Sequence, residues 1–167
     1  MEKWSSQDQL QPSLLDRLTD LDPEKTKESA SQQVLSQKQY KEAVIRDLGW
    51  LLNCVSLDCV VDLGPYPQVA RSVLNYGLPD LSGRTSSSID VTDLERDLQR
   101  VIDRFEPRLI PNSLRVRVRS SPQEMGKNAL VFEIEGVVFE QPMPFQVLLR
   151  SKLDLESGEF DVREERS

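Results

Sequence analysis

Two long segments of the chain place hydrophobic residues at helical spacing. The first predicts a helix over residues 37–52 with Ser36 as its N-cap, and the second predicts a helix over residues 92–105 that ends before Pro107. Each helix would bury one face and leave its charged residues outside. The apolar positions of the two faces are Tyr40, Val44, Ile45, Leu48, Leu51 and Leu52, and Leu94, Leu98, Val101, Ile102 and Phe105.

Beyond Pro111 the hydrophobic period changes from helical to two, which is typical of half-buried strands. A third, shorter helix starts at Pro67 and runs through Val73 and Leu74. The sequence therefore predicts an α+β domain with about three helices followed by an antiparallel sheet of three to four strands. The inward positions of the strands are Leu114, Val116 and Val118; Leu130, Phe132 and Ile134; Phe145, Val147, Leu149 and Leu153; and Phe160 and Val162.

The N-terminal region differs in composition from the rest of the chain. Residues 1–36 are rich in Ser, Gln and charged residues and predict a mobile, flexible tail, and residues 37–167 predict a single domain. Within the tail, residues 12–21 carry a helical stripe of leucines at Leu14, Leu15 and Leu18. So short a helix is marginal in water, so the stripe is either a docking segment or a transient helix without a partner.

Charge and composition narrow the class of function. The chain has 167 residues and a formal net charge of −7, which argues against a nucleic-acid partner. Three arginines, Arg115, Arg117 and Arg119, lie on one strand face, where cross-strand ion pairs would satisfy them. No run approaches the roughly 20 apolar residues of a membrane span, so we expect a cytoplasmic protein without direct membrane insertion.

The sequence contains no histidine and only two cysteines, which removes the common nucleophile pairs and zinc sites. No glycine-rich phosphate loop is present, so we expect no cofactor, no metal site and no catalytic residue. Cleavage of peptidoglycan would need two carboxyl groups across a cleft, and no clear pair stands out.

Three polar features remain as candidate interaction sites. Glu106 lies at a helix end before Pro107, and Arg108 could either neutralise it or donate to a partner chain. A loop from Asn75 to Asp80 could be a helix cap or a partner interface, with Tyr76 in it and Gly77 as a left-handed stop. The last strand, with Phe160, Asp161 and Val162, predicts a sheet edge that charge either protects or leaves open for strand pairing.

Three segments together resemble the TssE family of type VI secretion baseplate wedge proteins, whose phage-tail relatives have been labelled lysozyme-like. They are residues 46–53 (RDLGWLLN), residues 72–81 (SVLNYGLPDL) and residues 105–109 (FEPRL). The resemblance implies an assembly role in a membrane-docked baseplate, with TssF, TssG and TssK as partners and the sheath proteins TssB and TssC beyond them. It also implies that the corner of Glu106, Pro107 and Arg108 lies at a wedge interface. A regulatory binding module and a peptidoglycan-cleaving enzyme are the alternatives.

Overall fold

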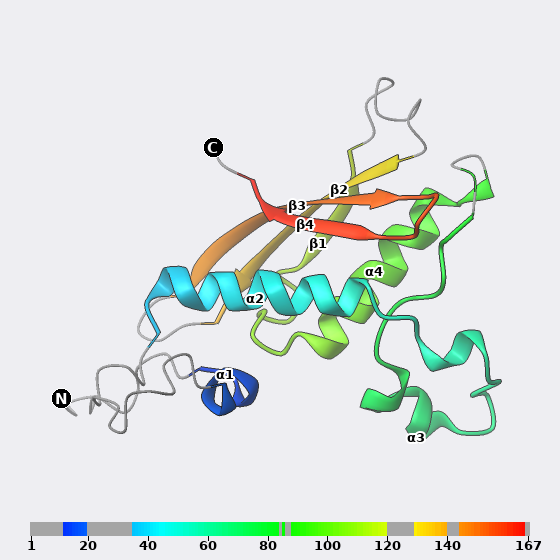
Figure 1. Ribbon diagram of the computed structural model, residues 1–167, viewed down its shortest axis with the longest axis horizontal. Helices are drawn as coiled ribbons and strands as arrows, with labels where there is room; N and C mark the ends of the chain where they lie inside the picture. The colour runs from blue at the N-terminus through cyan, green and yellow to red at the C-terminus, as the bar shows by residue number, and fades with distance from the viewer. Residues whose placement is uncertain are drawn as a thin grey trace.

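The computed structural model describes residues 12–19, 35–83, 85, 88–119, 129–139 and 144–165. Helices precede a four-stranded antiparallel sheet, which confirms the predicted α+β class (Figure 1). The helices are α1 (Leu14–Leu18), α2 (Gln37–Leu52), α3 (Pro67–Ala70) and α4 (Val91–Phe105), with two 3-10 helices, η3 (Leu57–Cys59) and η4 (Val73–Asn75). The strands are β1 (Arg115–Val118), β2 (Ala129–Val138), β3 (Phe145–Asp154) and β4 (Phe160–Glu164).

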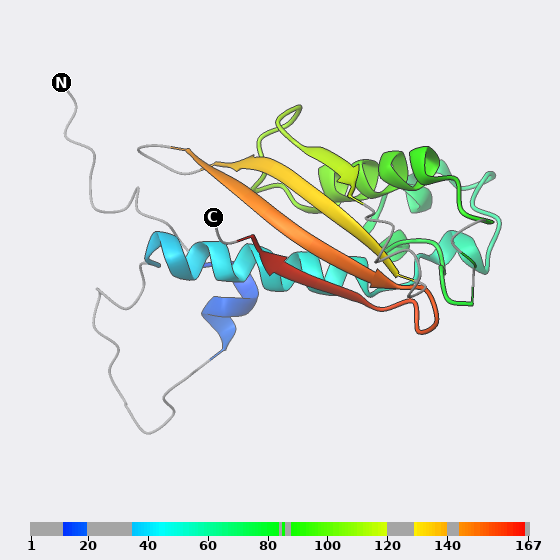
Figure 2. The same ribbon diagram turned by 90° about the horizontal axis from the view of Figure 1, so that it is seen from above.

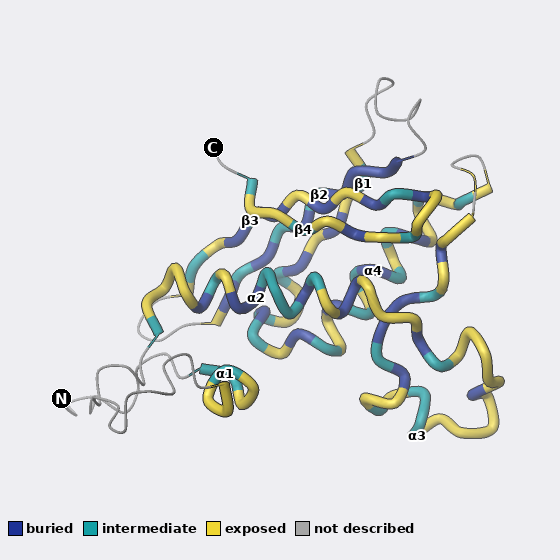
Figure 3. The backbone as a smooth tube through the Cα atoms, viewed as in Figure 1, coloured by how far each residue is buried: buried dark blue, intermediate teal, exposed yellow. Residues whose placement is uncertain are grey.

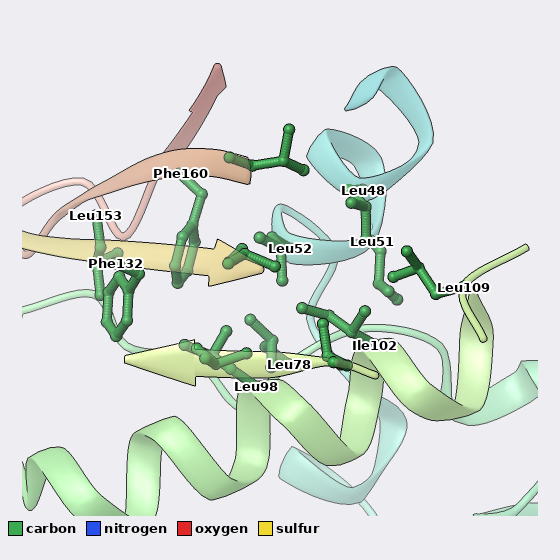
Figure 4. Close-up of a cluster of buried hydrophobic side chains, with 14 of the residues drawn as sticks. Leu48, Leu51, Leu52, Leu78, Leu98, Ile102, Leu109, Phe132, Leu153 and Phe160 are labelled. Atoms are coloured by element: carbon green, nitrogen blue, oxygen red, sulfur yellow. The ribbon is translucent and has the colours of Figure 1, made fainter. Parts of the chain in front are cut away.

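The strands follow one another as a meander in the order β1-β2-β3-β4. Both long helices lie below the sheet in Figure 1, and the view from above places α2 along β4 and α4 toward β1 (Figure 2). The resulting two layers enclose a single hydrophobic core. Its fully buried side chains include Leu48, Leu98, Ile102, Phe132 and Leu153 (Figure 4).

The caps of the two long helices explain their boundaries. Ser36 and Gln39 form a reciprocal capping box at the start of α2, and this helix has the bounds that the hydrophobic pattern predicts. Asp90 accepts hydrogen bonds from the backbone N–H groups of Thr92 and Asp93 and so starts α4 one residue earlier than predicted.

The short helix after Pro67 is shorter than predicted. It ends at Ala70, and η4 begins separately at Val73. Ser72 interrupts it, because its hydroxyl donates to the carbonyl of Val69 and accepts from the N–H of Leu74. Val73 and Leu74 are consequently 77% and 66% exposed and pack against no core.

The N-terminal helix α1 lies beside α2 and leaves its leucines outside. Leu14, Leu15 and Leu18 are 71%, 50% and 75% exposed, and α1 has no buried residue (Figure 3). The predicted mobility of residues 1–11 and 20–34, and the end of the leucine stripe, lie outside the described residues. Among the helices that the structure describes, none is long and apolar enough to cross a membrane.

Candidate functional site

The corner between α4 and the sheet is held by an ion pair within the chain. Glu106 is only 4% exposed, and Arg108 donates to it from the backbone N–H at 3.1 Å, from Nε at 2.6 Å and from Nη2. Of the two roles that the sequence leaves open for Arg108, the structure contains the intramolecular one. The role toward a partner chain stays a prediction.

The ion pairs continue from the corner to the N-terminal helix. Nη2 of Arg108 also donates to Oδ2 of Asp47 at 2.7 Å, and Oδ1 of Asp47 accepts from Arg46. Nη1 of Arg46 then donates to Oδ1 of Asp16 in α1 at 2.6 Å. Alternating acids and arginines thus link α1, α2 and the corner in one network. The pattern of α2 predicted Arg46 and Asp47 as solvent-facing, whereas both are half-buried here.

This network shifts the proton affinities of its members. Burial by itself would lower the pKa of the Arg108 guanidinium, but hydrogen bonds and charges from Glu106 and Asp47 outweigh burial and raise it. The hydrogen bond from Arg46 holds the pKa of Asp16 below its ordinary value of 3.8. Both arginines therefore stay charged, and Asp16 stays ionised at neutral pH.

A pocket of about 460 Å³ opens between α1, α2 and the corner. Aromatic rings supply much of its wall, and the ring of Tyr76 meets that of Phe105 edge-on at a centroid distance of 5.2 Å. The pocket brings together several residues that the sequence analysis named separately. Its lining residues are Ser13, Leu15, Tyr40, Asp47, Trp50, Leu51, Tyr76, Phe105, Glu106, Pro107 and Arg108.

Most of the loop from Asn75 to Asp80 serves the fold. Asn75 is buried, and its side chain bonds the backbone N–H of Asp58 and the carbonyl of Ala70. Gly77 has a φ of +119°, and a Cβ there would lie 2.2 Å from the carbonyl oxygen of Cys54. Asp80 is exposed and accepts from the N–H of Ser82. Of this loop, only Tyr76 lines the pocket.

Helix side chains close part of each sheet edge. On β4, the side-chain amide of Asn53 binds both the N–H and the carbonyl of Phe160, each at 2.9 Å. On β1, Glu95 accepts from the N–H of Val118 at 2.6 Å and Gln99 donates to the carbonyl of Leu114 at 3.2 Å. The sequence analysis did not identify these capping residues, because each acts on a strand far along the chain.

The rest of the β4 edge has backbone groups left unpaired by the described residues, although Lys41 of α2 forms an ion pair with the side chain of Glu164. The register of β3 and β4 turns the backbone groups of Asp161 and Arg163 toward β3 and those of Phe160, Val162 and Glu164 away from it. Within the described part of the chain, the outward groups of Val162 and Glu164 have no hydrogen-bond partner. Two of the three predicted edge residues therefore differ in their backbone hydrogen bonds. The outward groups of Phe160 are bound by Asn53, and those of Val162 are free to pair with another strand.

The exposed sheet face carries the alternating charges that the sequence predicts. Arg115 stands opposite Glu135 and Arg117 opposite Glu133, and Arg119 forms an ion pair with Glu133. Such cross-strand neighbours stabilise a sheet and offer no excess of positive charge for a phosphate backbone. Within the described residues, no cluster of Cys, Asp and Glu could hold a metal ion.

Comparison with known proteins identifies a family that matches most of the chain. Residues 38–143 match the family described as baseplate wedge protein gp25. A crystal structure from Geobacter sulfurreducens, provisionally named a tail lysozyme, is similar over 80% of this chain and 98% of that chain, at 17% sequence identity and a TM-score of 0.43. No curated protein matches the sequence.

Proposed function

The chain belongs to the baseplate wedge protein gp25 family, and from this premise we propose that it is a structural subunit of a type VI secretion baseplate. In this role it joins the wedge proteins TssF and TssG, with TssK nearby, in the cytoplasm beneath the membrane. It also helps to nucleate the contractile sheath of TssB and TssC. The resemblance of residues 46–53, 72–81 and 105–109 to TssE supports the secretion system over other contractile tails.

The observation that carries the sheath part of the proposal is the open half of the β4 edge. Val162 and Glu164 present outward backbone groups next to the clamped Phe160. Strand addition to such an edge is a common mode of recognition, because main-chain hydrogen bonds supply affinity without a dedicated pocket. A sheath strand pairing here would extend the meander by one strand.

The corner supports the wedge part of the proposal in a different way. Arg108 and Glu106 are occupied with each other, and Pro107 between them is exposed. The ion pair therefore acts as a rigid support that presents Pro107 and the pocket mouth to a wedge partner. Contact of Arg108 itself with that partner is a further part of the proposal.

A non-catalytic role agrees with the state of Glu106. Both of its carboxylate oxygens accept hydrogen bonds from Arg108, and its side chain is 4% exposed. A general acid in sugar cleavage needs access to its substrate, which a buried carboxylate held by arginine lacks. We therefore propose that this protein does not cleave peptidoglycan.

The wedge role is tested by co-expressing the chain with its cognate TssF and TssG, followed by size exclusion and native mass spectrometry. A stable complex is expected. Failure of the wild-type chain to co-elute would remove the assembly role and favour a regulatory module with another partner. Release of soluble fragments from purified peptidoglycan, lost in Glu106→Gln, would instead identify an enzyme.

The sheath role is tested with Val162→Pro, which deletes an N–H that points away from β3 and so costs no bond inside the sheet. Capture of TssB and TssC by the assembled wedge should fall, while the wedge itself still forms. Val162→Thr keeps both the N–H and the branched side chain and serves as the matched control. Equal sheath capture by both variants would remove the β4 edge from the proposal.

A further inference from the structure

The helix α1 turns a polar side chain toward the domain and its leucines toward the outside, whereas an ordinary amphipathic helix buries its apolar face. Its contact with the domain is polar, through Asp16, whose side chain is 18% exposed. Of the three leucines in this helix, Leu14 and Leu18 are more than two-thirds exposed and Leu15 is 50% exposed. Burial of apolar surface is the usual reason for a short helix to dock, so another interaction must hold α1 in this orientation.

Arg46 supplies that interaction and also orients Trp50. Its Nη1 donates to Asp16 at 2.6 Å, and its guanidinium carbon lies 4.8 Å from the centre of the Trp50 ring. Trp50 is 48% exposed and lines the pocket together with Leu15 of α1. One arginine therefore positions both the helix and the aromatic ring on either side of the pocket mouth.

The charges around this mouth are paired within the chain, with three carboxylates around two arginines. Arg46 binds Asp16 and Asp47, and Arg108 binds Asp47 and Glu106. An acidic partner segment would gain little here, because each arginine already has two carboxylates. The uncovered surface next to these pairs includes the α1 leucines, Trp50 and Pro107.

We propose that α1, Trp50 and the corner form one composite docking surface for an apolar segment of a wedge partner, with the Asp16–Arg46 ion pair as the contact that holds α1 in place. This inference rests on the proposed wedge role and adds the chemistry of the partner segment. On this inference, α1 and the corner of Glu106, Pro107 and Arg108 contact the same partner segment. Large apolar side chains around a preformed pocket are typical anchors of such interfaces.

The first experiment examines the isolated full chain. Asp16→Lys and Arg46→Glu should each raise hydrogen exchange of residues 12–19 and change the fluorescence of Trp50, measured in a Trp4→Phe background. The double variant, which reverses the pair, should restore the protection of residues 12–19 from exchange, whereas the Trp50 signal should stay altered because a glutamate cannot replace the guanidinium over the ring. Glu42→Lys makes the same change of charge as Asp16→Lys, on the exposed face of α2, and should leave both signals unaltered. Equal exchange in the wild type and both single variants would overturn the inference.

The second experiment measures association of the same variants with the purified TssF–TssG complex. Each single reversal should weaken binding about tenfold, because α1 must then be ordered during association, and the double variant should recover it. Normal binding by both single variants would overturn the inference and leave the wedge role intact. No binding by the wild-type chain would remove the wedge role, and with it the partner assigned to this surface.

The apolar chemistry of the partner segment is tested on α1 itself. Leu18→Ser replaces a 75% exposed side chain, so α1 should stay docked in the exchange experiment while the affinity for TssF–TssG falls. Arg17→Ser, on the same helix, should leave the affinity within twofold of the wild type, roughly the effect of one exposed charge. Loss of affinity in Arg17→Ser with normal binding by Leu18→Ser would show an ionic contact and overturn the inference.

Discussion

Asn53 clamps the outward backbone of Phe160 with both ends of its side-chain amide: Nδ2 donates to the carbonyl and Oδ1 accepts from the N–H, each at 2.9 Å. The residues lie 107 positions apart, at the end of α2 and the start of β4. The amide imitates a neighbouring strand at this one position. It ties the helix layer to the last strand and sets the point from which another strand could pair.

Asn53→Ala should destabilise the domain by about 2 kcal/mol, because two hydrogen bonds are lost and the Phe160 groups are left without partners. Thermal unfolding gives the change in stability, and hydrogen exchange at Phe160 gives its location. Exchange at that amide should rise more than exchange in β2. The exposed β3 residue Gln146 provides a control, since Gln146→Ala should leave the melting temperature within 2 °C, about the effect of a surface substitution.

Unchanged exchange at Phe160 in Asn53→Ala would mean that the clamp contributes nothing to the order of β4. In that case the edge available for strand pairing would include Phe160 as well as Val162 and Glu164. Sheath capture by the same variant separates the two functions of the amide, because a longer open edge should raise capture even as stability falls.

Arg108→Ala should be strongly destabilising even in the isolated chain. Glu106 would remain 4% exposed without its cation, and removal of one partner from a buried ion pair costs about 3 kcal/mol. For a domain of this size that corresponds to a fall of roughly 10 °C in Tm. Thermal unfolding followed by circular dichroism measures the change. Arg71→Ala removes an exposed arginine and should shift the Tm by no more than about 2 °C.

The double variant Arg108→Ala/Glu106→Gln separates the charge from the packing. A neutral amide in the place of the buried carboxylate removes the unpaired charge, so part of the lost stability should return. A Tm for Arg108→Ala equal to that of the wild type would contradict the internal role of the ion pair. It would then favour a role for Arg108 in contact with a partner alone.

Local pattern was sufficient for the main elements of the fold. The helical spacing of apolar residues and the Ser36 N-cap predicted α2, and the change to a period of two predicted an antiparallel sheet of three to four strands, of which the structure has four. The interruption at Ser72 was missed because a single hydroxyl bonding to Val69 decided it, and apolar periodicity does not detect such a bond.

The candidate site was less accessible to sequence reasoning. Its ion pairs connect Arg46 to a residue 30 positions away and Asp47 to one 61 positions away, and no local pattern selects such partners. The leucine stripe of α1 left open whether this segment docks or forms a transient helix without a partner. In the structure Asp16 of α1 pairs with Arg46, a contact that apolar periodicity does not detect, and the leucines stay outside.

Gly77→Ala should destabilise the domain by about 3 kcal/mol, through backbone strain and a clash. The φ of +119° disfavours any L side chain, and the new Cβ would lie 2.2 Å from the carbonyl oxygen of Cys54. That carbonyl already accepts from the N–H of Leu78 at 2.8 Å, so it cannot move without loss of a bond. Chemical denaturation gives the free energy of unfolding.

Gly49→Ala is the matched control for this change. Gly49 lies inside α2, and nothing stands within 4 Å of the Cβ position, so alanine should stabilise the helix by up to about 1 kcal/mol. Opposite signs for the two substitutions are the expected result. A destabilisation of equal size at both positions would mean that neither depends on the local geometry.

Acid should release α1 before or as the domain unfolds, and the sign follows from the Asp16–Arg46 contact. The hydrogen bond from Arg46 lowers the pKa of Asp16 below 3.8, so docking gains stability from the carboxylate above that value. The gain disappears as the pH falls through the lowered pKa and Asp16 takes up a proton. Trp50 fluorescence in the Trp4→Phe background should therefore change between about pH 5 and pH 2.

Asp16→Asn isolates this transition from acid unfolding of the whole domain. The amide cannot titrate, so at neutral pH the variant should already give the Trp50 signal that the wild type reaches in acid. Its signal should stay flat until the far-ultraviolet circular dichroism reports unfolding. Identical fluorescence curves for the wild type and Asp16→Asn would mean that the carboxylate of Asp16 does not hold α1. Another contact of the helix would then have to hold it against the domain.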